Sequence, residues 1–288
     1  MQISNKWKDY EVIDAGNGEK LERWNNIILR RPDPEAMWNV KNYDLWNNSN
    51  AIYHRSDTGG GYWEKKNVPD AWNVSYHGLT FKIGLTNFKH TGLFPEQASN
   101  WDYIMEKISK EKRSIRVLNL FAYTGGATLA ASKGGASEVV HVDASSGMIA
   151  WAKENVILSG LESNKIRFIC EDCLKFVQRE ARRGSKYDVI IMDPPSYGRG
   201  PNKEVWKTED HLYILIDECM NILSDKPLFF LVNSYTTGLS SIVLDNILKT
   251  SKLNKVGGSI QSGDLVLPIK RDKLLLPCGV FSRWEAND

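Results

Sequence analysis

The sequence lacks the features that would place the chain among secreted or membrane proteins. It holds only four cysteines in 288 residues, too few for the disulfide framework of a secreted domain. No apolar run approaches about 18 residues, the length that a membrane-spanning helix needs. The first residues, MQISNKWKDYEVID, are polar and do not follow the basic-then-apolar plan of a signal peptide. We therefore expect a cytoplasmic protein that does not enter a membrane.

An excess of charge of either sign is also missing. The formal net charge is +2, and hydrophobic residues make up 42% and charged residues 25% of the chain. These proportions are typical of a globular protein and exclude a disordered, collagen-like or coiled-coil chain. A domain that binds nucleic acid usually has a clear basic excess, so a basic surface on this chain must arise from folding.

The composition changes near residue 100, which predicts two domains. Seven of the ten tryptophans lie within residues 1–101, where short strands alternate with turns such as Asn17-Gly18. Apolar runs that alternate with helical segments follow, and this alternation is typical of a parallel sheet. We predict a small, mainly β N-terminal domain over residues 1–97. A Rossmann-like α/β domain over residues 98–288 would hold seven mostly parallel strands, with the last strand antiparallel.

The first predicted strand of the α/β domain ends in a segment that is suited to ligand binding. A glycine pair lets a ligand approach the backbone closely, although a tight turn would explain the pair equally well. The pattern is not GxGxxG, so a dinucleotide is a poorer candidate ligand. The residues in question are Phe121, Ala122, Tyr123, Thr124 and Gly125, which Gly126 follows.

Acidic residues follow the next two predicted strands. Asp143, with Ala144 and Ser145, ends the second strand, where a carboxylate can accept hydrogen bonds from ribose hydroxyls. Asp172, with Cys173, ends the third strand, where it can accept a hydrogen bond from an adenine amino group or cap the next helix. Because parallel strands end at one edge of the sheet, these turns together predict an adenosine pocket.

The fourth strand ends in the segment DPPSY, which is the most specific local signal. Its two prolines fix φ, so the Asp193 carboxylate and the Pro194 carbonyl become rigidly held acceptors, while Tyr197 can stack on a base. A mobile loop is expected over residues 198–207, with basic side chains for phosphate and an aromatic ring for stacking. Its candidate substrate contacts are Arg199, Lys203, Trp206 and Lys207.

Two other patterns are interpreted as structural. The pair Cys170-x-x-Cys173 has no second pair at zinc-ligand spacing, so no metal site is expected. A second basic run, with Arg179, Arg182, Arg183 and Lys186, is interpreted as a solvated helix end.

The order FAYTGG, VDAS, CEDC and DPPSYGRG resembles a class I S-adenosylmethionine-dependent methyltransferase. More closely, residues 45–288 resemble the 23S rRNA methyltransferase family that includes a cytosine-5 enzyme with an N-terminal PUA domain. The segment from Lys89 to Gln97 is similar to that family's motif before the sheet. The resemblance implies S-adenosylmethionine as cofactor, S-adenosylhomocysteine as product, rRNA as partner and a cofactor contact at Gln97.

The chain departs from this family in ways that bear on the reaction. The PUA domain is expected to be absent, Lys89 and His90 stand in inverted order, and Glu96 replaces an aspartate. The cytosine-5 members carry a nucleophilic cysteine after the fifth strand, where residues 231–240 read LVNSYTTGLS without one. We therefore expect direct methyl transfer to a base nitrogen. Alternatives are a DNA, protein or small-molecule substrate, and a binding relic without activity. A homodimer is left open.

Overall fold

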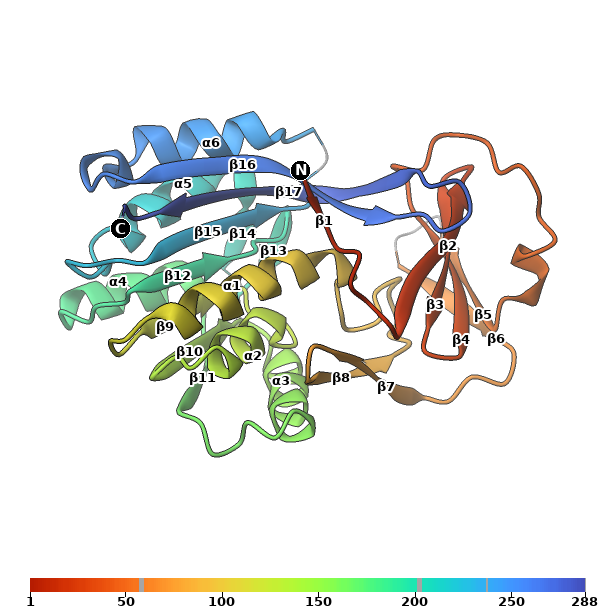
Figure 1. Ribbon diagram of the computed structural model, residues 1–288, viewed down its shortest axis with the longest axis horizontal. Coiled ribbons are helices and arrows are strands. Elements are labelled where there is room, and N and C mark those ends of the chain that lie inside the picture. The colour runs from red at the N-terminus through yellow and green to blue at the C-terminus, as the bar shows by residue number, and fades with distance from the viewer. Residues whose placement is uncertain (57–59, 201–203, 237, 288) are drawn as a thin grey trace. The chain divides into compact units, whose positions relative to one another are not determined.

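The computed structural model describes residues 1–288 except 57–59, 201–203, 237 and 288. The chain forms two compact units, shown in Figure 1. One, here called the sheet unit, comprises Met1, Asn100–Asp264 and Gly279–Asp288. The other, the β unit, comprises Gln2–Ser99 and Leu265–Cys278. The predicted division of the chain into domains over residues 1–97 and 98–288 stays a prediction.

The largest sheet has the strand order β1-β16-β17-β15-β12-β9-β10-β11. Five neighbouring strands from β15 to β11 are parallel, and β17 runs antiparallel to β15. This confirms the Rossmann-like sheet with an antiparallel last strand. The two-residue strand β1, which pairs with β16, adds an eighth strand that the apolar pattern did not reveal. The strands are β1 (Gln2–Ile3), β9 (Arg116–Leu120), β10 (Glu138–Asp143), β11 (Ile166–Cys170), β12 (Val189–Met192), β15 (Phe229–Ser234), β16 (Ser259–Pro268) and β17 (Leu275–Glu285).

Helices cover both faces of the parallel strands (Figure 1). They are α1 (Ala98–Lys110), α2 (Gly126–Lys133), α3 (Ser146–Leu158), α4 (Cys173–Arg182), α5 (Thr208–Cys219) and α6 (Ser241–Thr250), with a 3-10 turn, η3 (Lys252–Lys255), after α6. Within the described chain, no helix is long and apolar enough to cross a membrane.

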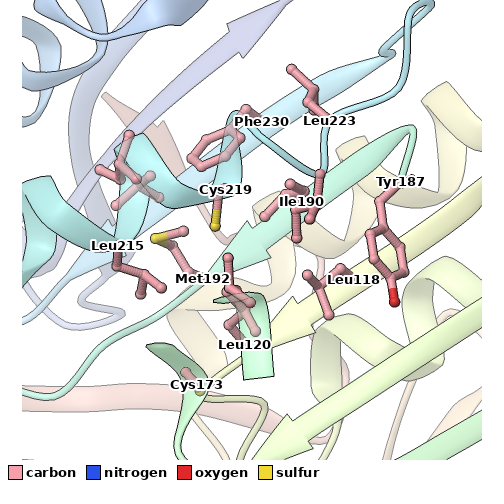
Figure 2. Packing of buried hydrophobic residues seen from close by; sticks show 14 of the residues in the cluster. Leu118, Leu120, Cys173, Tyr187, Ile190, Met192, Leu215, Cys219, Leu223 and Phe230 are labelled. Carbon is pink, nitrogen blue, oxygen red and sulfur yellow. The ribbon is translucent and has the colours of Figure 1, made fainter. Parts of the chain in front are cut away.

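A buried cluster joins α4, α5 and α6 to one face of the sheet. Figure 2 shows Leu118, Ile190 and Phe230 from three strands beside Leu215 and Cys219 from α5. Each fully buried large apolar side chain stabilises the fold by about 1.5–3 kcal/mol. Because side chains alternate along a strand, the residues between these ones face α1, α2 and α3. Asn119, for example, donates to Thr128 of α2. The core therefore holds the strand ends, and the loops that follow them, in fixed positions.

The β unit contains a five-stranded sheet and a separate hairpin. The sheet consists of β2 (Tyr10–Gly16), β3 (Glu19–Trp24), β4 (Ile27–Pro32), β5 (Ala51–Arg55) and β6 (Gly61–Lys65), and the hairpin of β7 (Ala71–Tyr76) and β8 (Leu79–Gly84). Two 3-10 turns, η1 (Trp46–Asn48) and η2 (Pro95–Gln97), follow its strands. Asn17 and Gly18 have φ of 52° and 77°, which confirms the predicted hairpin turn.

Candidate active site

The loop after β9 has a strained backbone and depends on two glycines. Phe121 and Tyr123 adopt φ of 53° and 50°, a left-handed conformation that is strained for large side chains and is typical of functional sites. Gly125 has φ 93°, and a Cβ there would lie 3.1 Å from Leu129. A Cβ on Gly126 would approach the Trp101 indole to 2.7 Å. Both glycines are therefore required by the geometry of this turn.

Asp143 at the end of β10 connects this loop to the next one. Its Oδ2 accepts a hydrogen bond from the Tyr123 N–H at 2.8 Å, and its Oδ1 accepts one from the Ser145 N–H at 2.8 Å. Burial raises the pKa of the Asp143 carboxyl group, and these two N–H donors partly oppose that shift. Each carboxylate oxygen keeps a second lone-pair direction, so a ligand hydroxyl can still donate to it. Ser145 caps α3 by accepting from the Met148 N–H at 3.4 Å.

The end of β11 supplies a helix cap and a thiol that binds the first loop. Asp172 Oδ1 accepts from the Lys175 N–H at 2.9 Å, so the carboxylate caps α4. Cys173 is 3% exposed, and its Sγ accepts from the Phe121 N–H at 3.3 Å. Burial raises the pKa of Cys173 well above its ordinary value, so its thiol is unreactive. Ala144 accepts from the exposed Cys170 Sγ at 3.6 Å.

The segment DPPSY follows β12 and is held in place by hydrogen bonds to its backbone, one of them from Trp206. The Trp206 indole is 6% exposed and donates to the Pro195 carbonyl at 2.7 Å. Thr208 Oγ1 donates to the same carbonyl at 2.9 Å, and Ser196 Oγ bonds Thr236 Oγ1 at 2.9 Å. Trp206 was expected to stack on substrate. It is instead a supporting residue, because its ring is buried against Phe121 at 4.7 Å between centroids.

Residues expected to form a mobile loop pair as a short ribbon. Strands β13 (Tyr197–Arg199) and β14 (Val205–Lys207) are antiparallel, with Tyr197 opposite Lys207 and Arg199 opposite Val205. These four side chains are exposed, whereas Gly198 and Trp206 alternate with them. The ribbon therefore presents two cations and an exposed Tyr197 ring on one face. Lys203 lies outside the described residues.

The other predicted residues also have defined places. Asp193 and Pro194 directly follow β12, which pairs with β9 in the sheet. The strand order reverses between β9 and β12, and ligands of such sheets bind at this switch point. Gln97 lies in the β unit at the end of η2 and is 7% exposed.

Sequence reasoning missed several buried polar residues that support the first loop. Asn155 of α3, fully buried, donates to the Thr124 carbonyl at 2.9 Å. His141 is fully buried and its Nδ1 lies 2.9 Å from Thr128 Oγ1. The same hydroxyl accepts from the Asn119 amide at 2.9 Å, so the three side chains form one buried hydrogen-bonded group. Burial lowers the pKa of His141 to about 3. The one sequence signal for such a supporting role is a polar residue that interrupts an apolar run.

The loops after β9, β10, β11 and β12 fit S-adenosylmethionine by their hydrogen-bonding groups. Carboxylates lie at the ends of three successive strands or just after them, at Asp143, Asp172 and Asp193. Charge at this edge is mainly acidic, which suits a cofactor with a positive sulfonium and ammonium group. Among the described residues, no group of three metal-binding side chains was found.

Residues 49–246 match the family model for the S-adenosylmethionine-dependent methyltransferases. The fold is very similar to the crystal structure of the SAM-dependent methyltransferase from Agrobacterium tumefaciens. The TM-score is 0.94 at 40% identity, over 99% of this chain and 93% of that one. A putative methyltransferase in complex with SAH has the same fold, with a TM-score of 0.69 at 18% identity over 97% of this chain and 76% of that one.

Curated relatives match a shorter stretch. The ribosomal RNA large subunit methyltransferase K/L of Shewanella sp. (strain ANA-3) is 36% identical over 129 residues, which are 44% of this chain and 18% of the relative. The protein of that name from Colwellia psychrerythraea is 29% identical over 181 residues, or 62% of this chain and 24% of the relative. The chain thus matches only about a fifth of the length of these relatives.

Proposed function

Because the chain belongs to the S-adenosylmethionine-dependent methyltransferase family, we propose that it methylates RNA, with rRNA of the large ribosomal subunit as substrate. The names of the curated relatives support this choice of substrate. The proposal includes direct transfer to a base nitrogen and a place in the cytoplasm. The bound cofactor supplies an electrophilic methyl group on its sulfonium sulfur.

The loops would divide the work of binding and alignment. Asp143 would accept hydrogen bonds from the ribose and Asp172 from the adenine amino group, while the turn at Gly125 admits the methionine part. Asp193 and the Pro194 carbonyl would orient the acceptor nitrogen. This alignment is the main requirement of an in-line transfer, and it can reduce the barrier by several kcal/mol.

The observation that carries direct transfer is the state of the cysteines. Cytosine-5 transfer needs a thiolate at the acceptor. Cys173 and Cys219 are buried and burial raises the pKa of both, whereas the exposed Cys170 ends β11, away from β12, and its Sγ donates to the Ala144 carbonyl. Cys278 belongs to the β unit, and burial raises its pKa as well. A base nitrogen carries its own lone pair and needs no thiolate.

The ribbon would hold the substrate beside this acceptor site. Tyr197 is 52% exposed and can stack on a base that is turned out of its helix. Arg199 and Lys207 on the same face can contact phosphates on either side of that base.

The test is transfer of labelled methyl from S-adenosylmethionine to rRNA, ribosomal subunits, tRNA, DNA and total protein from cells that lack the gene. We expect label in rRNA, on a base nitrogen by mass spectrometry. Asp193→Asn should reduce transfer by about a hundredfold because it misaligns the acceptor, with cofactor binding unchanged. Asp70→Asn, an exposed control in the β unit, should be fully active.

Other outcomes would replace the proposal. Label on cytosine C5 would contradict the cysteine argument, and label in protein, DNA or a small molecule would change the substrate class. Cofactor binding without any transfer, including to ribosome assembly intermediates, would indicate a binding relic.

A further inference from the structure

The edge of the sheet opposite the candidate active site carries a group of cations. The parallel strands begin at this edge, which we call the amino edge and define as residues 111–116, 134–138, 159–167, 183–188 and 220–228. Its cations are Lys112, Arg113, Arg116, Lys165, Arg167, Arg183, Lys186 and Lys226. Its acids are Glu111, Glu138, Glu162, Asp188 and Asp225.

The cations at the amino edge form a band, in which arginines and lysines from different loops share the same acids or bond each other's backbone carbonyls. Glu138, 5% exposed, accepts from Arg116 Nε at 2.9 Å and pairs with Lys165 Nζ at 3.0 Å. Arg116 Nη1 also donates to the Lys186 carbonyl at 2.7 Å, which extends the band to the start of β12.

Arg113 extends the band further. It donates to Asp188 Oδ1 at 2.8 Å and, through Nη2, to the Lys226 carbonyl at 2.7 Å, before β15. Glu138 and Asp188 are buried and pair with Arg116, Lys165 and Arg113, and Arg183 pairs with Glu180. The positive charge in excess of the acids is therefore carried mainly by Lys112, Lys186 and Lys226.

The candidate active-site edge has the opposite sign. Its described loops hold Asp143, Glu171, Asp172, Asp193 and Glu204, against Arg199 and Lys207. Glu171 and Glu204 are paired with Arg179 and Lys175 of α4, which leaves the three aspartates as its acidic charge. A polyanion is therefore attracted to the amino edge more strongly than to the edge where the chemistry would occur. The near-neutral net charge of the chain conceals this separation.

Helix ends explain only part of the band. Cations are favoured at the C-terminus of a helix, which accounts for Arg183, the C-cap of α4. Lys165, Arg167 and Arg116 instead lie at the starts of strands. Charges on an exposed edge strand also limit aggregation, but this reason applies only to β11 and not to Lys112, Lys186 or Lys226.

We propose that the amino-edge band binds the phosphate backbone of the RNA substrate away from the reacting base. The choice of RNA rests on the proposed function. Strand β9 has five residues, so the two edges lie about 17 Å apart at about 3.3 Å per residue. One nucleotide cannot reach both edges. The substrate is therefore a folded RNA that contacts both, and a short oligonucleotide around the target base is a poor substrate.

The test compares RNA binding across salt concentrations for three variants. The band variant is Lys112→Gln, Lys186→Gln and Lys226→Gln, and a second variant, Lys165→Gln with Arg167→Gln, removes the charges near Glu138. The control, Lys66→Gln with Lys153→Gln, removes exposed cations outside the amino edge. Thermal melting and S-adenosylmethionine binding are measured in all three, and neither should change in the band variant.

We expect the slope of log K against log salt to fall by about two to three in the band variant, because each lost phosphate contact contributes about 0.7–0.9. Its affinity at low salt should fall about tenfold or more, and the control should match the parent chain. The parent should also methylate folded RNA much faster than a short oligonucleotide, and the band variant should lose that preference.

An unchanged slope and affinity in the band variant would overturn the proposal, as would a parent chain that does not bind RNA. If RNA is methylated equally well by the parent and the band variant, the band proposal fails and the proposed function stands. If RNA binding depends on the band but RNA is never methylated, the band proposal stands and the proposed function fails.

Discussion

At the scale of single residues, Asp143 connects the loops after β9 and β10, because its two oxygens accept from Tyr123 and Ser145. In Asp143→Asn the amide nitrogen cannot accept from one of these N–H groups, and the charge is lost. We expect S-adenosylmethionine affinity to fall about tenfold, as for a lost hydrogen bond to a charged group. Calorimetric titration measures this, and affinity like that of the parent would contradict the role. Asp70→Asn serves again as the control.

Glu96 provides a residue-scale prediction on pH. Its side chain is buried in the β unit, and burial raises its pKa to about 7 although Lys20 and Arg31 oppose the shift. The unfolded chain releases this proton near 4.5, so between about pH 4.5 and 7 the folded state binds more protons. The free energy of unfolding therefore decreases as pH rises through this range, by about 3 kcal/mol from this group.

Glu96→Gln should remove that loss. The amide has nearly the same shape and no charge to bury, so the variant should be more stable than the parent at pH 8 and close to it at pH 4. Urea unfolding at a series of pH values measures the difference. Glu35→Gln, at an exposed position of the same unit, should leave the pH profile unchanged. A parent profile retained in Glu96→Gln would show that this carboxyl group does not titrate as described.

At the scale of elements, the β13–β14 ribbon and the DPPSY segment support each other through Trp206. Trp206→Phe keeps an aromatic ring but removes the indole N–H that donates to the Pro195 carbonyl at 2.7 Å. We expect stability to fall by about 1 kcal/mol. The turnover number for methyl transfer should fall severalfold, because the ribbon and Asp193 lose their relative alignment. Cofactor affinity should be retained. A turnover number equal to that of the parent would show that the ribbon does not contribute to the reaction.

At the scale of the whole molecule, the two units are interleaved along the chain. Residues 265–278 belong to the β unit, where Leu265 and Val266 pair with Gln2 and Ile3. A fragment of residues 98–288 would therefore expose side chains that are now buried, including Leu265, Leu267 and Leu276. Each would cost about 1.5–3 kcal/mol of burial. We expect this fragment to aggregate, as measured by light scattering. A monomeric, cofactor-binding fragment would instead support a separate domain over 98–288.

Local signals predicted much of the fold and of the candidate site. The apolar runs indicated all seven strands from β9 to β17 that form the Rossmann-like sheet, because strands covered on both faces need continuous hydrophobicity. Asn17-Gly18 predicted its turn, because the required positive φ is a property of those residues. Strand β1 escaped prediction, because two residues carry no pattern. The turn of the β7–β8 hairpin lies at His77 and Gly78, with φ of 44° and 78°.

The sequence by itself therefore determined which motif follows each strand and that these motifs form an adenosine pocket, since the residues after parallel strands meet at one edge of the sheet. The resemblance of the motifs to a known family then gave the cofactor class. Only the tertiary structure decided which side chains support that edge rather than face a ligand. Trp206 is buried behind Pro195, and Asn155 holds the Thr124 carbonyl from another helix. The basic amino edge was equally invisible, because its cations come from loops far apart in sequence. Tertiary packing decides which side chains are buried and which distant loops lie side by side, so the local sequence alone does not predict either.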